Sequence, residues 1–388
     1  MPFISLVSIN FAPNASVMKH LLWALFLVLY QTAFTQSIAP HAHSRAIHFP
    51  DVAPYQTMVC DFHQHTVFSD GSVWPDIRVQ EALKDSVDAI SLTEHLEYQP
   101  HLADIPHSDR NRSYDLATDF AKPYDLIVVR GAEITRKMPP GHINAIFIED
   151  ANRLMIEDSI EVFREARRQG AFTFWNHPNW IAQYKDGVAK VTGMHHFLMQ
   201  EGLLNGIEVV NDLTYSDEAL RIALDYNLTI MGTSDVHGLV DWQYKVADGG
   251  HRPVTLVFTT ERSPEAIKEG LENKRTVVWY NNNLIGRESE LIPLLNACLK
   301  VTKVSYQGIS AVATVSIYND SDALFILMNN SDFQLHADTD VVMLHPNTTT
   351  SIEVKTKEQL EDFELKFQVL NAVTAPGEHP SISLEINQ

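Results

Sequence analysis

Residues 57–71 read TMVCDFHQHTVFSDG, an apolar run that ends in closely spaced histidines and is followed by an aspartate. The apolar and β-branched residues at 57–65 predict a strand, and the period of two along a strand places His63 and His65 on the same face. Two imidazoles at this spacing can bind one metal ion. The turn Ser69-Asp70-Gly71 follows directly. This stretch therefore predicts a strand that carries metal ligands at its C-terminal end.

The same order of a short apolar run followed by polar residues recurs to about residue 280. We expect strands at 57–65, 89–94, 126–134, 142–148, 171–176, 206–211, 228–233, 253–259 and 276–280. Between them we expect helices at 75–87, 109–121, 157–169, 215–226 and 263–272. This alternation is typical of βα units with a parallel sheet, and it predicts a closed or nearly closed barrel.

Residues that can bind metal ions follow most of these expected strands. They occur in Thr93-Glu94-His95, Gly131-Ala132-Glu133, Gly141-His142, Asn176-His177-Pro178 and Ser234-Asp235-Val236-His237. The C-terminal rim of a βα barrel is where active sites are built. A single histidine or aspartate there is more often a hydrogen-bonded loop residue. A whole ordered set is costly to bring together unless cations neutralise it, so the set predicts a metal site.

Taken together, these motifs resemble the polymerase and histidinol phosphatase (PHP) family of phosphoesterases over roughly residues 57–280. The resemblance implies a distorted seven-stranded α/β barrel and, as in the trinuclear members, three divalent ions. It assigns one ion to His63, His65, Glu133 and Asp235. It assigns a second ion to Glu133, His142 and His177, with Glu133 bridging the two, and a third ion to Asp70, His95 and His237. We call these residues the predicted ligand set.

The predicted ligand set also indicates which metals and which chemistry to expect. Its many imidazoles favour Mn²⁺ or Zn²⁺, and Fe²⁺ is compatible as well. We expect a hydroxide that bridges the first two ions to attack phosphorus in line, with Glu133, Asp235 and His237 as catalytic residues. The net charge of the chain is −20. An anionic substrate must therefore be attracted locally, by an excess of positive charge on the ions.

The kind of phosphoester is indicated by a narrower resemblance. Residues 133–147, residues 109–114 and the C-terminal region look similar to exported bacterial PHP phosphodiesterases of the haloalkyl-phosphate type, which favours a diester. Guanidinium and ammonium groups suit phosphate oxygens. The candidates for substrate binding are Arg112, Arg136 and Lys137, followed by Lys185 and Arg252. For each of them a solvated surface position is the alternative.

Other functions stay open at this point. A phosphomonoesterase of the same family and an exonuclease-like activity are the enzymatic alternatives, and a non-catalytic, metal-stabilised binding module is the alternative from another class. The acidic composition argues against nucleic acid as a partner, because no clustered Lys and Arg residues form a basic groove. We therefore expect a small anionic phosphoester as the partner. The oligomeric state is not indicated.

After about residue 285 the pattern changes to strands separated by Asn, Asp and Ser. We expect strands near 310–318, 323–328, 350–354 and 363–370. A chain of 388 residues with 45% hydrophobic and 20% charged residues suits a two-domain globular protein. The prediction is an α/β barrel at 57–285 followed by a small all-β sandwich at 286–388. The histidines outside the ligand set, among them His48, His195, His196 and His251, are expected in a tail or at the surface.

The N-terminus has the features of an export signal. Residues 21–30 are apolar, Lys19 precedes them, and Ala33 and Thr35 form a small-x-small pattern. We predict a signal peptide at 1–35, a true start at Met18 and a tail at 36–56, which implies export to the periplasm or beyond without stable membrane insertion. Cys60 and Cys298 are expected to be buried thiols rather than a disulfide.

Overall fold

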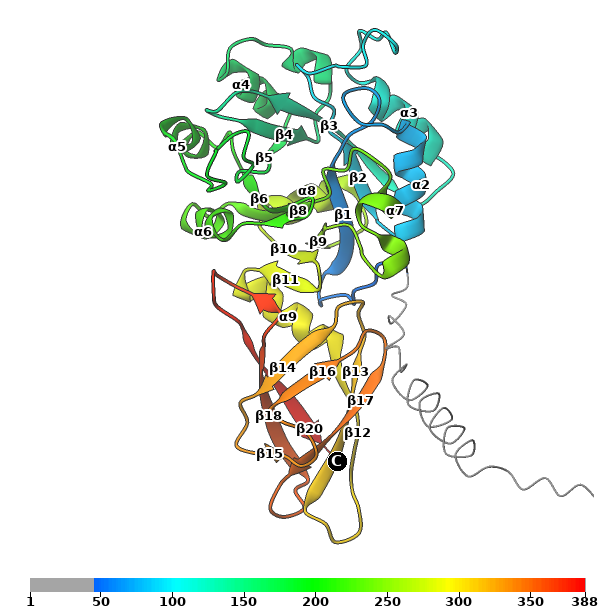
Figure 1. Cartoon of the computed structure of the whole chain (residues 1–388), viewed down its shortest axis with the longest axis vertical. Helices are drawn as coiled ribbons and strands as arrows, with labels where there is room; N and C mark the ends of the chain where they lie inside the picture. The colour runs from blue at the N-terminus through cyan, green and yellow to red at the C-terminus, as the bar shows by residue number, and fades with distance from the viewer. Residues whose placement is uncertain (1–44, 388) are drawn as a thin grey trace, which may run out of the picture. The chain divides into compact units, whose positions relative to one another are not determined.

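The computed structural model describes residues 45–387 (Figure 1). The predicted signal peptide and the first part of the predicted tail therefore lie outside the described residues. Residues 45–55 pack against the folded chain instead of forming a loose tail. Ile47 and Phe49 are buried in the hydrophobic core, and the backbone N–H of His48 donates to Asp322 Oδ2 at 2.6 Å. His48 is thus held in place, contrary to the expectation of a tail.

Most of the expected barrel elements are present, within a few residues of their predicted ends. The strands are β1 (Gln56–Gln64), β2 (Ala89–Leu92), β3 (Ile127–Thr135), β4 (His142–Ile146), β5 (Phe172–Trp175), β6 (Gly206–Asn211), β7 (Thr214–Tyr215), β8 (Thr229–Thr233), β9 (Val254–Thr259), β10 (Thr276–Tyr280) and β11 (Asn283–Gly286). The helices are α2 (Pro75–Asp85), α3 (Arg112–Ala121), α4 (Glu161–Arg168), α5 (Gly193–Gln200), α6 (Asp217–Asp225), α7 (Val240–Gln243) and α8 (Pro264–Glu272), with short 3₁₀ turns at Ala151–Leu154 and Val246–Asp248.

The sheet of the barrel is mixed, and the prediction of a parallel sheet was wrong in this respect. Its order is β19-β11-β10-β9-β1-β2-β3-β4-β5-β6-β7, with β8 paired to β6. Strand β4 is antiparallel to both β3 and β5, and β9 is antiparallel to both β1 and β10. The loop between β3 and β4 is too short for the crossover that a parallel pair requires, so β4 must run back along β3.

Backbone hydrogen bonds between the chain after β8 and the end of β1 close the curled sheet. The N–H of Asp235 donates to His63 O at 2.8 Å, and the N–H of His65 donates to Val236 O at 3.1 Å. The two groups of predicted ligands are therefore neighbours on adjacent backbone segments. In Figure 1, α2 and α3 lie beside β1 and β2, and α4, α5 and α6 lie beside β4, β5 and β6.

Helix starts follow ordinary capping chemistry where the sequence predicts them. Ser263 precedes α8 and accepts a hydrogen bond from the N–H of Ala266, with Pro264 in the first helical position.

Helix α5 was not expected. It begins after Thr192 and buries His195, whose ring stacks on Trp175 at 3.9 Å and bonds to Pro140 O at 2.7 Å. The surface position expected for His195 was therefore wrong, because partners on neighbouring segments satisfy the buried imidazole.

The C-terminal part is the predicted small β-sandwich, preceded by an unexpected helix α9 (Glu288–Cys298). Its strands are β12 (Leu299–Tyr306), β13 (Val312–Asn319), β14 (Phe325–Asn329), β15 (Gln334–Leu335), β16 (Val341–Leu344), β17 (Thr349–Lys355), β18 (Asp362–Val369), β19 (Ala372–Val373) and β20 (Ser381–Asn387). Two four-stranded sheets have the orders β12-β13-β17-β15 and β16-β14-β18-β20, and β19 instead pairs with β11 of the barrel. The fold class expected from the sequence, an α/β barrel with a small all-β sandwich, is confirmed.

Two smaller expectations concern cysteines and membranes. Cys60 and Cys298 are both buried and free, as predicted. Within residues 45–387, no helix combines the length and the apolar character that crossing a bilayer requires.

Candidate metal centre

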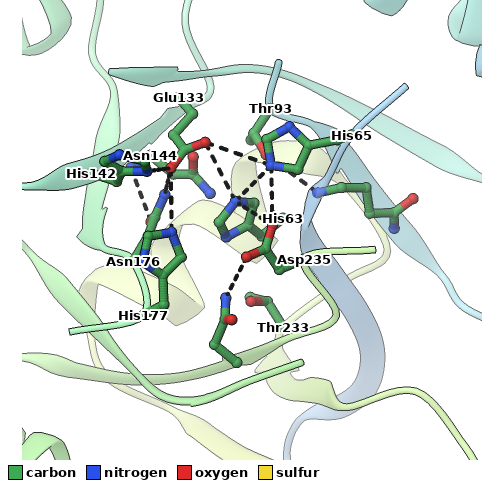
Figure 2. A network of polar contacts seen from close by, with 12 residues as sticks. His63, His65, Thr93, Glu133, His142, Asn144, Asn176, His177, Thr233 and Asp235 are labelled. Carbon is green, nitrogen blue, oxygen red and sulfur yellow. Dashed lines mark hydrogen bonds and ion pairs between the residues drawn. The ribbon is translucent and has the colours of Figure 1, made fainter. Parts of the chain in front are cut away.

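The end of β1 and the loop after β8 bring three predicted ligand atoms into a triangle (Figure 2). His63 Nε2 and His65 Nε2 are 3.0 Å apart, and each lies 3.1 Å from Asp235 Oδ1. Ligand atoms about 2.0–2.2 Å from one ion are about 3 Å from one another, so this triangle matches one face of a coordination sphere. The expectation that His63 and His65 share a strand face is confirmed.

Glu133, at the end of β3, faces histidines on two sides with its two carboxylate oxygens. Oε1 lies 2.8 Å from His142 Nδ1 and 3.6 Å from His177 Nε2, and Asn176 Nδ2 donates to this oxygen at 3.0 Å. Oε2 lies 3.6 Å from His65 Nε2 and 3.8 Å from His63 Nε2. Figure 2 shows Glu133 between these two histidine groups. This is the position that a bridging carboxylate would occupy.

A third group forms around Asp70, on the turn that follows β1. His237 Nε2 lies 3.1 Å from Asp70 Oδ1, and His95 Nε2 lies 3.5 Å from Asp70 Oδ2. His95 also approaches Glu133, since its Nδ1 lies 2.6 Å from Glu133 Oε2. The third group is therefore continuous with the first two. All the residues of the predicted ligand set meet in one cluster at the mouth of the barrel.

The hydrogen bonding of the cluster tests whether metal ions fit it. Four buried ligand atoms have no hydrogen-bond partner among residues 45–387, although each lies close to another ligand atom. They are Asp70 Oδ1, Glu133 Oε2, His142 Nδ1 and Asp235 Oδ1. Buried polar atoms are rarely left unsatisfied, and charged ones least of all. Such atoms, which converge without bonding to one another, fit cations placed between them. Within the described part of the chain, three groups of residues could each hold an ion, and they overlap at His65 and His95: His65, Asp70, His95 and His237; His63, His65 and Asp235; and His95, Glu133 and His142.

Charge interactions in the cluster shift its pKa values in opposite directions. Burial lowers the pKa of His65 to about 3, helped by the positive charges of His95 and His237. Burial also acts to lower the pKa of His95, but Glu133 and Asp70 outweigh it and raise that pKa to about 10. The pKa of Glu133 lies well below its usual range, because His95 and His142 overcome the effect of burial. Without metal, the positive charge of His95 therefore offsets the negative charge of Glu133.

These pKa shifts predict that metal binding releases protons. At pH 7 the His95 imidazole, with a pKa of about 10, carries a proton that must leave when the ring binds a cation. We expect roughly one proton or more to be released per chain, and the apparent metal affinity to rise by roughly tenfold per pH unit for each displaced proton. Calorimetric titration of chelator-stripped protein in buffers of different ionisation enthalpy measures this release. A His95→Gln variant should release less, and a binding heat at pH 7 that is independent of the buffer would contradict the prediction.

Glu208 on β6 orients the ligands from behind and was not found in the sequence. His63 Nδ1 donates to Glu208 Oε1 at 2.8 Å, which leaves His63 Nε2 to face the metal site. The backbone N–H of His177 donates to Glu208 Oε2 at 2.6 Å, and Asn211 Nδ2 donates to the same oxygen at 2.8 Å. An acidic residue inside the otherwise apolar run of the predicted strand 206–211 was the signal in the sequence that could have identified it.

Two further buried residues hold the loops that carry the ligands. Arg78 of α2 donates to His65 O and to Val236 O, both at 3.0 Å, and so ties the end of β1 to the loop after β8. Glu94 accepts hydrogen bonds from Ser69 Oγ and Thr66 Oγ1, each at 2.5 Å, and fixes the turn that carries Asp70. Both residues therefore help to position the predicted ligands.

Backbone conformation also marks the ligand loops. His177 and Asp235 have φ values of 30° and 48°, in the left-handed region that non-glycine residues rarely adopt. Such strained residues persist where surrounding contacts hold them, often at functional sites. Here the hydrogen bonds of Glu208 to the His177 backbone and of His63 to the Asp235 backbone supply those contacts.

Gly71 allows the Asp70 turn to lie against β1, and this leads to a second prediction. A Cβ atom at Gly71 would lie 2.6–2.7 Å from the backbone of His65 and Thr66. We expect Gly71→Ala to move Asp70 outward and to lower metal affinity by about 10- to 100-fold, as outer contacts of metal sites do. Metal content after dialysis against a weak chelator measures this. Gly238→Ala is the control, because a Cβ there meets nothing within 4 Å. Equal metal retention in the two variants would refute the prediction.

A cavity of about 510 Å³ opens beside the cluster, within the size range of small-molecule sites. Besides members of the predicted ligand set, it is lined by Asn179, Trp180, Ile181, Asn211, Asp212, Thr214 and Gln243. Among residues 45–387 no lysine or arginine lines it. These non-ligand residues could not be identified in the sequence, because they lie on loops that reach the cavity only when the barrel is folded.

The cations proposed to bind the substrate are not brought to this cavity. Arg112 and Lys137 are exposed, and Arg136 forms an ion pair with Glu97 at 3.0 Å and bonds to the carbonyl of Ile156. Lys185 is exposed as well. Arg252 is fully buried between Asp61 and Asp85, so its assignment as a substrate-binding candidate was wrong. His251 stacks on Trp279 at 3.5 Å and does not reach the cavity.

A mixed α/β barrel whose mouth gathers imidazoles and carboxylates around a cavity defines the class of metal-dependent barrel enzymes. Comparison with known proteins then gives the family. A two-domain protein from Bacteroides vulgatus, containing a predicted PHP-like metal-dependent phosphoesterase, is 42% identical over 88% of this chain and 98% of its own, with a TM-score of 0.82. The chain belongs to this family of two-domain PHP-like metal-dependent phosphoesterases. The family expected from the sequence is thereby confirmed.

The remaining comparisons add less. The family of Ig-like domains matches residues 299–385, which correspond to the C-terminal sandwich. A predicted metal-dependent phosphoesterase from Bifidobacterium adolescentis is 17% identical, covers 46% of this chain and 88% of its own, and has a TM-score of 0.36. PsfC from Pseudomonas syringae is 15% identical, covers 62% and 96%, and has a TM-score of 0.40. Both are too distant to carry an argument. No curated protein gives a match.

Proposed function

We propose that this protein hydrolyses a phosphodiester at a centre of three divalent metal ions held by the predicted ligand set. The observation that carries the proposal is the convergence of His63, His65 and Asp235 with Glu133 at distances that fit coordination. Glu133 Oε2 and Asp235 Oδ1 have no hydrogen-bond partner among residues 45–387. When bound, the ions would supply Lewis-acid chemistry, by neutralising phosphate charge and lowering the pKa of water. The family supports divalent metals in general, and the histidine-rich ligands favour Mn²⁺ or Zn²⁺.

Each proposed catalytic residue has a distinct position. Glu133 is fully buried and faces both histidine groups, so it would fix the spacing of two ions. Asp235 would complete the first ion site, and Asn211 Nδ2 donates to its Oδ2 at 3.2 Å. His237 has 38% of its side chain exposed, against 0% for His63 and His65. An entering substrate would therefore reach His237 more easily than His63 or His65.

Charge in the cavity favours a diester over a monoester. No lysine or arginine among residues 45–387 lines the cavity, and Asp212 adds a carboxylate outside the ligand set. The phosphate charge would thus be balanced by the ions alone. A diester carries one negative charge at neutral pH, whereas a monoester approaches two. The more weakly charged ester suits a cavity without protein cations, and this is consistent with the haloalkyl-phosphate diesterase type that the sequence resembles.

The test compares a diester and a monoester before and after metal removal. We expect bis(p-nitrophenyl) phosphate to be hydrolysed faster than p-nitrophenyl phosphate, and a chelator to abolish both activities until Mn²⁺ or Zn²⁺ is restored. His177→Ala should lose most activity, and His196→Ala, an exposed histidine bonded to Tyr226, is the matched control. Activity after complete metal removal would refute the proposal. A preference for the monoester would indicate a phosphomonoesterase, and no turnover of either ester a binding module.

We also propose that the mature protein is exported and acts on a small soluble phosphoester rather than on nucleic acid. The support is the apolar segment 21–30 behind Lys19 and the net charge of −20. N-terminal sequencing of protein recovered from the exported fraction of the producing cells tests this. A mature chain that still begins at or before Met18 would contradict cleavage near Thr35.

A further inference from the structure

We infer that Trp180 and Asp212 form a subsite for the alcohol portion of the substrate, and that this portion is uncharged and rich in hydroxyl groups, as in a sugar or polyol ester. The inference rests on the proposed function, because the subsite lies in the cavity beside the same candidate metal centre. The residues concerned lie outside the predicted ligand set, on the loops after β5 and β6.

Asp212 is distinguished by its place and by its free oxygen. Among residues 45–387, it is the one titratable side chain that lines the cavity without belonging to the predicted ligand set. Gln243 Nε2 donates to Asp212 Oδ1 at 2.6 Å, and the Tyr244 hydroxyl lies 3.3 Å from the same oxygen. The described residues give Oδ2 no partner. A carboxylate fixed through one oxygen and open at the other is a hydrogen-bond acceptor for a ligand O–H group.

The backbone fixes Asp212 relative to the metal centre. Its N–H donates to Thr233 O at 3.2 Å, and Thr233 precedes Asp235 by two residues on the chain. Asp212 also has a φ of 50°, in the left-handed region that non-glycine residues rarely adopt. The backbone position of Asp212 is therefore tied to the strand that leads to Asp235.

Trp180 provides an apolar wall next to the ligands. Its ring is 5.1 Å from that of His177 and 5.6 Å from that of His142, and both pairs meet edge to face. Trp180 is nevertheless 46% exposed, and its neighbour Ile181 is 69% exposed. Large apolar side chains at this exposure, held against a metal site, offer a flat surface for the C–H face of a ring.

The other residues that line the cavity indicate which chemical class of alcohol portion fits it best. Asn179 and Thr214 are uncharged hydrogen-bonding groups, which suit hydroxyls. A second phosphate would face Asp212 with no cation lining the cavity, so bisphosphates and polynucleotides are disfavoured. A cationic amino alcohol could pair with Asp212, but it would leave the neutral amide and hydroxyl groups unused. A hydroxyl-rich arm uses all of these groups at once.

The test uses the metal-loaded full chain and esters that differ in one arm. The arms are glucos-6-yl, cyclohexylmethyl, choline and 1-phosphoglucos-6-yl, each as the methyl phosphodiester and as the monoester. We expect kcat/KM for the glucosyl ester to exceed that for the cyclohexylmethyl ester by at least about tenfold, since unfilled polar groups penalise the ring without hydroxyls. Asp212→Asn should reduce this ratio towards unity, and Trp180→Ala should raise KM for both ring esters. Asp186→Asn should leave the ratio unchanged, because Asp186 is an exposed carboxylate that pairs with Lys190 on the loop that carries Trp180.

The outcomes separate this inference from the proposed function. Equal kcat/KM for the glucosyl and cyclohexylmethyl esters, or a preference for the choline or bisphosphate arm, would overturn the subsite while leaving phosphoester hydrolysis intact. If no ester is turned over, the proposed function fails, and calorimetric binding of the same monoesters then decides the subsite alone. A glucosyl ester bound no more tightly than the cyclohexylmethyl ester would overturn it. Metal content and thermal melting verify that each variant is folded and loaded.

Discussion

Replacing Glu133 by glutamine is expected to lower kcat/KM by at least about 10³-fold, more than the 10- to 100-fold typical of outer contacts of a metal site. The amide keeps the shape of the side chain but removes the negative charge that faces His142 on one side and His65 on the other. It also places a donor where cations should bind. Metal analysis of the purified variant and steady-state kinetics with Mn²⁺ or Zn²⁺ in excess measure the effect.

The control for this variant is Glu201→Gln, which changes an exposed carboxylate at the end of α5. It should keep full metal content and activity. If Glu133→Gln retains activity within about tenfold of the wild type with excess metal, Glu133 does not bridge ions, because removal of a bridging charge cannot be compensated by an amide. A loss of activity with normal metal content would instead indicate a direct role of Glu133 towards the substrate.

Replacing Arg252 by methionine is expected to destabilise the barrel by about 3–5 kcal/mol, because it leaves the fully buried Asp61 without a counter-charge. Among residues 45–387, Asp85 then retains only the partly exposed Arg45, whose Nε lies 2.9 Å from Asp85 Oδ1. Arg252 Nη1 lies 3.2 Å from Asp61 Oδ2, and Nε and Nη2 each lie 2.8 Å from Asp85 Oδ2. Burial would lower the pKa of Arg252, but the two aspartates raise it, so the guanidinium stays charged. Urea unfolding of metal-free protein, followed by tryptophan fluorescence, measures the change.

The matched control for Arg252 is Arg164→Met on α4, whose ion pair with Glu161 is about half exposed. Exposed pairs contribute only about 0–1 kcal/mol, so this variant should unfold close to the wild type. Asp61 also accepts from the N–H of Ser234 at 3.0 Å, directly before Asp235. We therefore expect Arg252→Met to weaken metal binding as well. Equal unfolding midpoints for the two variants would show that the buried network is not required.

The sequence was most informative where chemistry and local geometry coincide. A strand period of two is enough to place His63 and His65 together, and the structure brings their Nε2 atoms to 3.0 Å. The appended β-sandwich could also be predicted, because alternating apolar residues and polar turns are local signals. Strand direction was less accessible. The short loop before β4 makes it antiparallel to β3 only because the two strands are neighbours in the sheet, and the alternation of strands and helices did not show that they are.

The partners of charged residues could not be predicted from the sequence. Arg136 and Arg252 looked alike in the sequence as possible phosphate ligands, yet one pairs with Glu97 and the other is enclosed by Asp61 and Asp85. Glu208 was overlooked because an isolated acidic residue in a strand has no partner in sequence; its partner, His63, lies on another strand. Long-range pairing of this kind is determined only when distant segments pack.

The amino-acid sequence by itself predicted the residues that meet in the candidate metal centre and the class of fold, since both depend on residue type and on short-range periodicity. The tertiary structure alone decided what surrounds those ligands. It moved the predicted substrate cations away from the cavity and brought Trp180 and Asp212 to its wall. The physical reason is that the residue type alone specifies which atoms of a side chain can bind a metal ion. The lining of a cavity, in contrast, depends on contacts between segments that are far apart in the chain.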